Sequence, residues 1–155
     1  MTTSAEIIAT LIERGYQIAV AESLTGGLLV AELIDTPGAS AVVVGGVVAY
    51  NTELKASVLN VDAGALAEHG AVHPDVAAQM ATGVRAALAL AAGPPHIGIS
   101  TTGVAGPEPQ DGQSVGTVYL GFAIGGGCFI RGITSRAAHQ AQGDRSQGLT
   151  IPVTH

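Results

Sequence analysis

Polar clusters follow three short apolar runs in this sequence, at positions where β-strands are expected to end. The first cluster is Glu-Ser-Leu-Thr-Gly-Gly at residues 22–27, the second occupies residues 50–55, and the third is the small-residue loop 102–107. Open α/β sheets bind their ligands in the crevice at the carboxyl ends of the strands. We therefore predict that the three clusters converge on one site.

The side chains in these clusters are of the types that acyl transfer requires. Ser23 supplies a hydroxyl nucleophile, Lys55 an amine and Tyr50 a phenol. Lys55 is the only lysine in the chain. Partial burial near the end of an apolar strand would lower its pKa, so that it accepts the serine proton near neutral pH. We predict Ser23, Tyr50 and Lys55 as catalytic residues, with Tyr50 as a relay or orienting group.

Backbone N–H groups complete the predicted site. A strand that ends in Ser-x-Thr-Gly-Gly and opens into a helix points the unpaired N–H groups of the first helical turn at a ligand. We therefore predict that Thr25, Gly26 and Gly27 contact the substrate. N–H groups near Gly26 or Gly103 are predicted to stabilise the oxyanion.

Each of these residues also has a purely structural interpretation. Ser23 or Thr25 can cap the following helix, a common role for serine and threonine. Lys55 can be a solvated surface charge, and Tyr50 an amphipathic residue at a strand edge. The residues by themselves leave both interpretations open.

The elements that would position these clusters alternate between helix and strand. Apolar spacing predicts helices at residues 3–14, 28–34, 51–58, 62–68 and 74–92, and strands at 17–21, 42–50, 97–101, 115–124 and 128–134. The strand at 42–50 is nearly continuously apolar, which predicts burial on both faces. The pattern predicts an α/β fold: a three-layer α/β/α sandwich with a mixed, mostly parallel sheet and a C-terminal antiparallel hairpin.

Composition limits the class of protein. The chain has 155 residues, a net charge of −6 and 12% charged residues, and its length favours a single domain over residues 1–155. The absence of a basic block argues against nucleic-acid binding. The longest apolar stretch, residues 39–49, is far short of the about 20 residues of a membrane helix. With one cysteine and no signal-peptide pattern, we expect a cytoplasmic protein without a membrane partner.

Metal and cofactor sites are not predicted. His69 and His73 have the spacing of helical metal ligands, but Gly70 and Pro74 interrupt a helix through them. The sequence has no Walker or dinucleotide-binding motif. We expect neither a metal nor a cofactor.

Five segments, taken together, resemble the CinA C-terminal domain family in order and spacing, from about residue 5 to residue 134. They are Ala-Glu-Ser-Leu-Thr-Gly-Gly (21–27), Pro-Gly-Ala-Ser (37–40), Val-Ala-Tyr-Asn (48–51) with Lys55, His-Gly-Ala-Val (69–72), and Thr-Gly-Val-Ala-Gly-Pro (102–107) with Val-Gly-Thr-Val-Tyr (115–119). Each motif alone is weak, whereas the ordered set is highly specific.

The resemblance implies a three-layer α/β/α fold and nicotinamide mononucleotide (NMN) deamidase activity. This reaction hydrolyses the carboxamide of NMN to nicotinic acid mononucleotide and ammonia in pyridine nucleotide salvage. By the resemblance, Ser23 is the nucleophile, and Tyr50 and Lys55 activate it. The loop that begins at Thr102 and Gly103 is expected to contribute to the substrate pocket.

The resemblance extends to Arg145, which matches a family arginine near the substrate and is expected to pair with its phosphate. Other positions depart from the family pattern. Leu24 replaces a usual cysteine, and His73 replaces a usual serine. Where the family continues as a long amphipathic helix, residues 146–155 contain Gly148 and Pro152, so we expect this tail to be irregular or disordered.

Two other functions are compatible with the same residues. One is a non-catalytic nucleotide-binding or interaction module of the same fold, and the other is an amidase that acts on a different substrate. We also expect a homo-oligomer, because a short α/β domain with few surface charges can bury a face against another copy. A monomer in light scattering at micromolar concentration would contradict this expectation.

Overall fold

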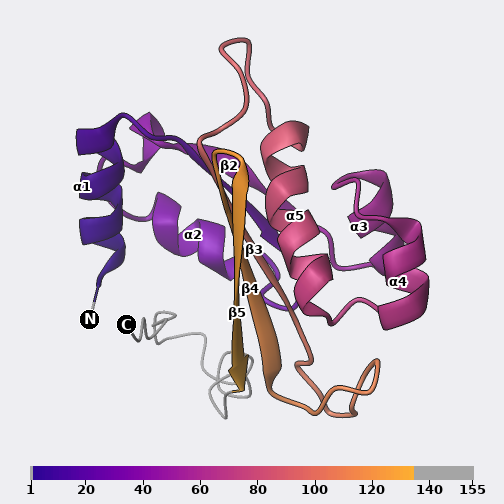
Figure 1. Cartoon of the computed structure of the whole chain (residues 1–155). Coiled ribbons are helices and arrows are strands. Elements are labelled where there is room, and N and C mark those ends of the chain that lie inside the picture. The colour runs from indigo at the N-terminus through magenta and orange to yellow at the C-terminus, as the bar shows by residue number, and fades with distance from the viewer. Residues whose placement is uncertain (1, 135–155) are drawn as a thin grey trace.

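The computed structural model of the chain describes residues 2–134. Its elements are α1 (Ser4–Arg14), β1 (Ile18–Glu22), α2 (Leu28–Ile34), a 3₁₀ turn (Ala39–Ala41), β2 (Val43–Val48), α3 (Thr52–Ser57), α4 (Ala63–His69), α5 (Pro74–Ala87), β3 (Ile97–Gly103), β4 (Thr117–Ile124) and β5 (Gly127–Thr134). The described residues form three layers, with α1 and α2 on one side of the sheet and α3, α4 and α5 on the other (Figure 1). The predicted α/β/α sandwich is confirmed. The predicted tail 146–155 lies outside the described residues.

The sheet has five strands in the order β2-β1-β3-β4-β5. β1 pairs in parallel with β2 and with β3, whereas β3–β4 and β4–β5 are antiparallel. The mixed sheet and the closing hairpin are therefore as predicted. Parallel and antiparallel pairs are equal in number, so the sheet is less parallel than expected.

Two details of the predicted elements are wrong. β2 is an edge strand of the sheet and none of its residues is fully buried, so burial on both of its faces does not occur. α5 ends at Ala87 rather than near residue 92. The chain after it folds into a tight turn in which Leu90 and Gly93 exchange both backbone hydrogen bonds, and this turn replaces the last helical turn.

The core lies on both faces of β1 because successive side chains of a strand point to opposite faces. Ile18 and Val20 pack against α1 and α2, whereas Ala19 and Ala21 pack in the cluster that contains α5. Small residues on the α5 side let that helix approach closely. At Gly121 of β4, a Cβ atom would lie 2.2 Å from the carbonyl oxygen of Ala77, so a side chain there would push α5 away.

Candidate active site

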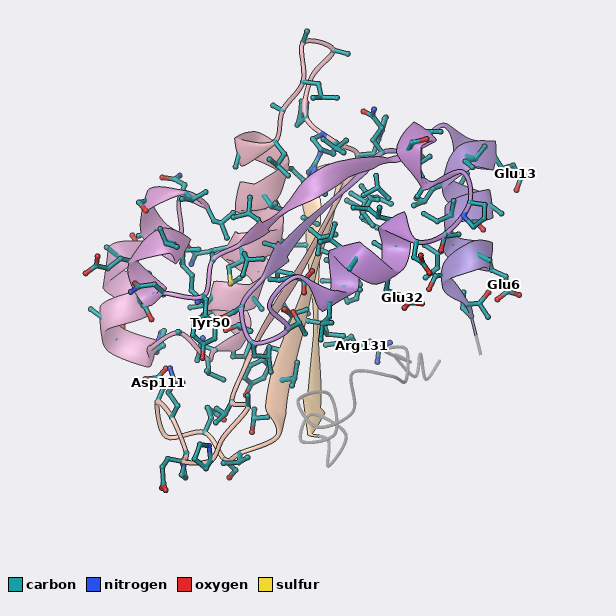
Figure 2. The ribbon with its side chains drawn as sticks, turned by 180° about the vertical axis from the view of Figure 1, so that it is seen from behind. Glu6, Glu13, Glu32, Tyr50, Asp111 and Arg131 are labelled. Atoms are coloured by element: carbon teal, nitrogen blue, oxygen red, sulfur yellow. The ribbon has the colours of Figure 1, made fainter. Side chains whose placement is uncertain are left out.

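The three polar clusters meet at one edge of the sheet, as predicted. β1, β2 and β3 are mutually parallel, so the residues that follow their carboxyl ends lie together. A pocket forms at this edge and is lined by Ser23, Leu24, Tyr50, Thr52, Lys55, Ala71, Val72, Thr102, Gly103, Val104, Ala105, Gly106, Glu108 and Gln110. Figure 2 shows Tyr50 at this end of the molecule, near Asp111 of the β3–β4 loop.

The turn after β1 is held by the buried carboxylate of Glu22. This carboxylate accepts the N–H groups of Gly27 at 3.0 Å, Leu29 at 3.1 Å and Val30 at 2.7 Å, and so satisfies the start of α2. The cap of this helix is therefore neither Ser23 nor Thr25. The Ser23 hydroxyl remains available for another role.

The Ser23 hydroxyl pairs with the only lysine in the chain. Lys55 Nζ lies 3.0 Å from Ser23 Oγ, and both side chains are buried. Lys55 is positioned by α3, which begins directly after the carboxyl end of β2 and is capped by the side chain of Asn51. The surface-charge interpretation of this lysine is wrong, because only 1% of the residue is exposed.

Burial sets the acidity of this lysine. Removal from water disfavours the ammonium form and lowers the pKa of Lys55 from 10.5 to about 8, while the negative charge of Asp111 acts in the opposite direction. A lysine with this pKa is partly neutral near physiological pH. It can therefore accept a proton from the serine, which a surface lysine cannot do at this pH.

Tyr50 is placed beside the pair through its backbone. Its carbonyl oxygen accepts from Lys55 Nζ at 3.4 Å, next to the Ala49 carbonyl at 2.8 Å. The residue is 73% exposed, and within residues 2–134 its phenol has no hydrogen bond to Ser23 or Lys55. Lys55 can thus accept the proton of Ser23 directly, and the phenol of Tyr50 is not needed as a relay.

The N–H groups of the Ser23 turn divide into used and free donors. Gly26 N–H donates to the Ser23 carbonyl at 3.1 Å, and Gly27 N–H donates to Glu22. Among the described residues, the N–H groups of Leu24 and Thr25 have no acceptor, and Leu24 lines the pocket. The N–H groups of Leu24 and Thr25 are thus free to donate beside Ser23. The N–H group of Gly26, which was predicted as a donor to the oxyanion, is already used within the turn.

The predicted substrate contacts are only partly brought together. Thr102 and Gly103 line the pocket, although the Thr102 hydroxyl donates to the Ala71 carbonyl at 2.7 Å. Thr25 Oγ1 instead pairs with Thr101 Oγ1 at 2.7 Å, and Gly26 and Gly27 do not line the pocket. Arg145 lies outside the described residues.

Three residues around the site were not predicted from the sequence. Thr101 supports the Ser23 turn through its contacts with Thr25 and with the Ser23 N–H at 3.4 Å. Glu22 accepts N–H groups at the start of α2 although it lies at the end of β1, so its place in the sequence is not that of an ordinary helix cap. Asp111 lies far away in the sequence, and only the folded loop brings it to the site.

The histidines flanking the α4–α5 turn lie together despite the break in the helix. The rings of His69 and His73 stack with centroids 4.1 Å apart, and Asp75 lies nearby. His73 Nδ1 already accepts the Asp75 N–H at 3.2 Å and caps α5. A metal at this nitrogen would have to displace the cap.

Within residues 2–134, no helix is both long and apolar enough to cross a membrane.

Comparison with known proteins gives consistent matches. Residues 1–150 match the family model described as the CinA C-terminal domain. A CinA-like protein of Frankia casuarinae is 49% identical over 147 residues, which are 95% of this chain and 31% of that relative. The chain thus spans under a third of that relative's length.

Solved structures resemble the fold as well. A competence-damaged protein (CinA) superfamily protein from Escherichia coli matches with a TM-score of 0.81 at 28% identity, over 89% of this chain and 78% of that one. The competence damage-inducible protein A from Klebsiella pneumoniae matches with a TM-score of 0.78 at 32% identity, over 91% of both chains. The chain belongs to the CinA C-terminal domain family.

Proposed function

We propose that this domain is an amidohydrolase that deamidates NMN to nicotinic acid mononucleotide and ammonia. The observation that carries the proposal is the buried pair of Ser23 Oγ and Lys55 Nζ, 3.0 Å apart, at the base of a pocket. Membership in the CinA family supports a reaction of this kind. The pair supports acyl transfer, and the family resemblance supplies NMN as the substrate.

Acylation begins with the neutral lysine. Nζ takes the proton from Ser23 as Oγ attacks the carboxamide carbon, and the carbonyl oxygen becomes an oxyanion. The free N–H groups of Leu24 and Thr25 are the candidate donors to this oxyanion. The C–N bond then breaks, and the Lys55 ammonium gives its proton to the leaving nitrogen, which departs as ammonia.

Deacylation uses the same groups in the reverse order. A water molecule loses a proton to Lys55 and attacks the ester carbon of the acyl-enzyme. The bond to Ser23 Oγ breaks, and Oγ recovers the proton from Lys55. The product is a carboxylic acid, and both side chains return to their starting protonation states.

The pocket also has to bind an anionic substrate in a protein of net charge −6. We propose that Arg145 pairs with the NMN phosphate, as the family resemblance implies. In this proposal Lys55 does not serve the phosphate, because its ammonium is buried against Ser23 and two carbonyl groups.

Ammonia release from a panel of amides tests the reaction and the substrate. We expect turnover of NMN and little turnover of nicotinamide, nicotinamide riboside or glutamine. Faster release of ammonia from another amide would identify that amide as the substrate in place of NMN, and the proposed mechanism would stand. Release from none, together with NMN binding in calorimetry, would instead favour the nucleotide-binding module.

A further inference from the structure

The outer wall of the pocket is a loop that contributes little to the core. The connection between β3 and β4 supplies the lining residues Ala105, Gly106, Glu108 and Gln110. Between Val104, which is buried, and Gly116, none of its residues is fully buried. Apolar packing therefore does not fix this wall, and polar contacts must hold it in place.

One such contact comes from Asp111 at the tip of the loop. Its carboxylate accepts the N–H of Ala71 at 2.8 Å, across a separation of 40 residues. The carbonyl oxygen of the same residue, Ala71, accepts from the Thr102 hydroxyl at 2.7 Å. Ala71 itself lines the pocket, so the loop, the α4–α5 turn and the end of β3 are tied together at one residue.

The shape of the α4–α5 turn fits this carboxylate. Gly70 has a φ of +75°, and a Cβ atom built there would lie 2.1 Å from Asp111 Cγ. Asp111 has a φ of 53°, a conformation that Asp tolerates better than most residues. Gln110 and Gln113 exchange backbone hydrogen bonds of 3.1 and 2.8 Å, which close the turn that carries Asp111.

Asp111 also acts on the catalytic lysine electrostatically. Its negative charge raises the pKa of Lys55, against the larger effect of burial. Tyr50 and Glu108 are the other titratable groups that line the pocket beside Lys55. Asp111 is exposed, so salt is expected to weaken its effect on the lysine.

We propose that Asp111 is a positioning residue of this site: its carboxylate fastens the outer wall of the pocket to Ala71. The effect that we expect on NMN hydrolysis rests on the proposed function. Without the carboxylate the wall loses its attachment to Ala71.

The lysine can be observed directly, because Lys55 is the only one in the chain. In protein labelled with ¹³C-lysine, the Cε signal of Lys55 is followed against pH, and amide exchange of Ala71 is measured in the same samples. Asp111→Asn removes the charge but keeps an oxygen that accepts the Ala71 N–H, whereas Asp111→Ala removes both. Glu68→Gln, which neutralises an exposed carboxylate on α4, is the control.

We expect the Lys55 titration to move to lower pH in both Asp111 variants and to stay in place in Glu68→Gln. Exchange at Ala71 is expected to rise at least about tenfold in Asp111→Ala only, with a higher KM for NMN and a smaller change in kcat. Exchange at Ala71 that stays unchanged in Asp111→Ala would overturn the proposal. The NMR readouts need no turnover, so a protein that shows both shifts without hydrolysing NMN would refute the proposed function alone.

Discussion

Lys55 Nζ lies 3.0 Å from Ser23 Oγ, and its two other partners are the carbonyl oxygens of Ala49 and Tyr50. A carbonyl oxygen has no proton to give. The two N–H groups of a neutral lysine can therefore donate to these carbonyls, which leaves the nitrogen lone pair for the serine proton. Once the ammonium has lost its proton, the two carbonyl groups thus orient the lone pair of Lys55 Nζ toward Ser23, as a general base requires.

This arrangement predicts how activity depends on pH. Lys55 must be neutral to activate Ser23, and burial lowers its pKa to about 8. We expect kcat/KM for NMN to rise with pH as one proton is lost, with an apparent pKa near 8, and then to level off. Ammonia release measured from about pH 6 to pH 10 gives this profile. A rate that is flat or falls across this range would contradict Lys55 as the base.

The roles of Lys55 and Tyr50 can be separated by substitution. Loss of a general base costs about 10²- to 10⁴-fold in rate, which we expect for Lys55→Met. Tyr50→Phe keeps the backbone carbonyl that contacts Lys55 and removes only a phenol on a residue that is 73% exposed, so we expect less than a tenfold loss. Steady-state kinetics of both variants make the comparison. A loss in Tyr50→Phe equal to that in Lys55→Met would instead establish the phenol as a proton relay.

The buried lysine also predicts a pH-dependent stability. Its pKa falls from 10.5 in water to about 8 in the folded chain, so the unfolded state binds more protons between these values. The free energy of unfolding should therefore rise with pH in this window, by at most about 3 kcal/mol. Below about pH 8 both states are protonated, and the contribution is constant.

Urea unfolding of the wild-type protein and Lys55→Met at about pH 7.5 and pH 10.5 tests this sign. Other titrating groups are shared by the two proteins and cancel in their difference. We expect the free energy of unfolding of the wild type, relative to that of Lys55→Met, to be larger at about pH 10.5 than at about pH 7.5. A difference that stays the same at both pH values would show that the folded lysine has an ordinary pKa.

Glu22 is predicted to matter for stability as well as for the placement of Ser23. A glutamine there keeps one acceptor oxygen for three N–H groups and loses the negative charge at the start of α2. We expect Glu22→Gln to lower the free energy of unfolding by about 2–3 kcal/mol and to reduce kcat. Glu13→Gln, on the outer surface of α1, should change neither. Equal stability of the two variants in urea would show that the buried carboxylate is not needed.

The order of helices and strands was predictable because each element carries a local signal. Asn51 and Pro74 mark helical starts, and Gly70 marks an end. The partial exposure of β2 was not predictable in this way. Its apolar residues are typical of a central strand, and its edge position depends on which strands pair.

The pairing of Ser23 with Lys55 followed from residue type and position, whereas the groups that support the pair did not. Ser23 and Lys55 each follow a predicted strand, and parallel strands bring such ends together. The acceptor of the Gly26 N–H and the contact of Asp111 with Ala71 depend on turn geometry. Such contacts are set by the folded loops and leave no period or motif in the sequence.

Ammonia release from NMN by Ser23→Ala, beside wild type and Ser57→Ala, tests the central claim most directly. Ser57 is an exposed serine on α3, close in sequence to Lys55, and so controls for the loss of a hydroxyl. We predict that Ser23→Ala binds NMN but releases ammonia at the uncatalysed rate, while Ser57→Ala keeps wild-type activity. Wild-type release by Ser23→Ala would contradict the account, because the attacking oxygen would then belong to another group.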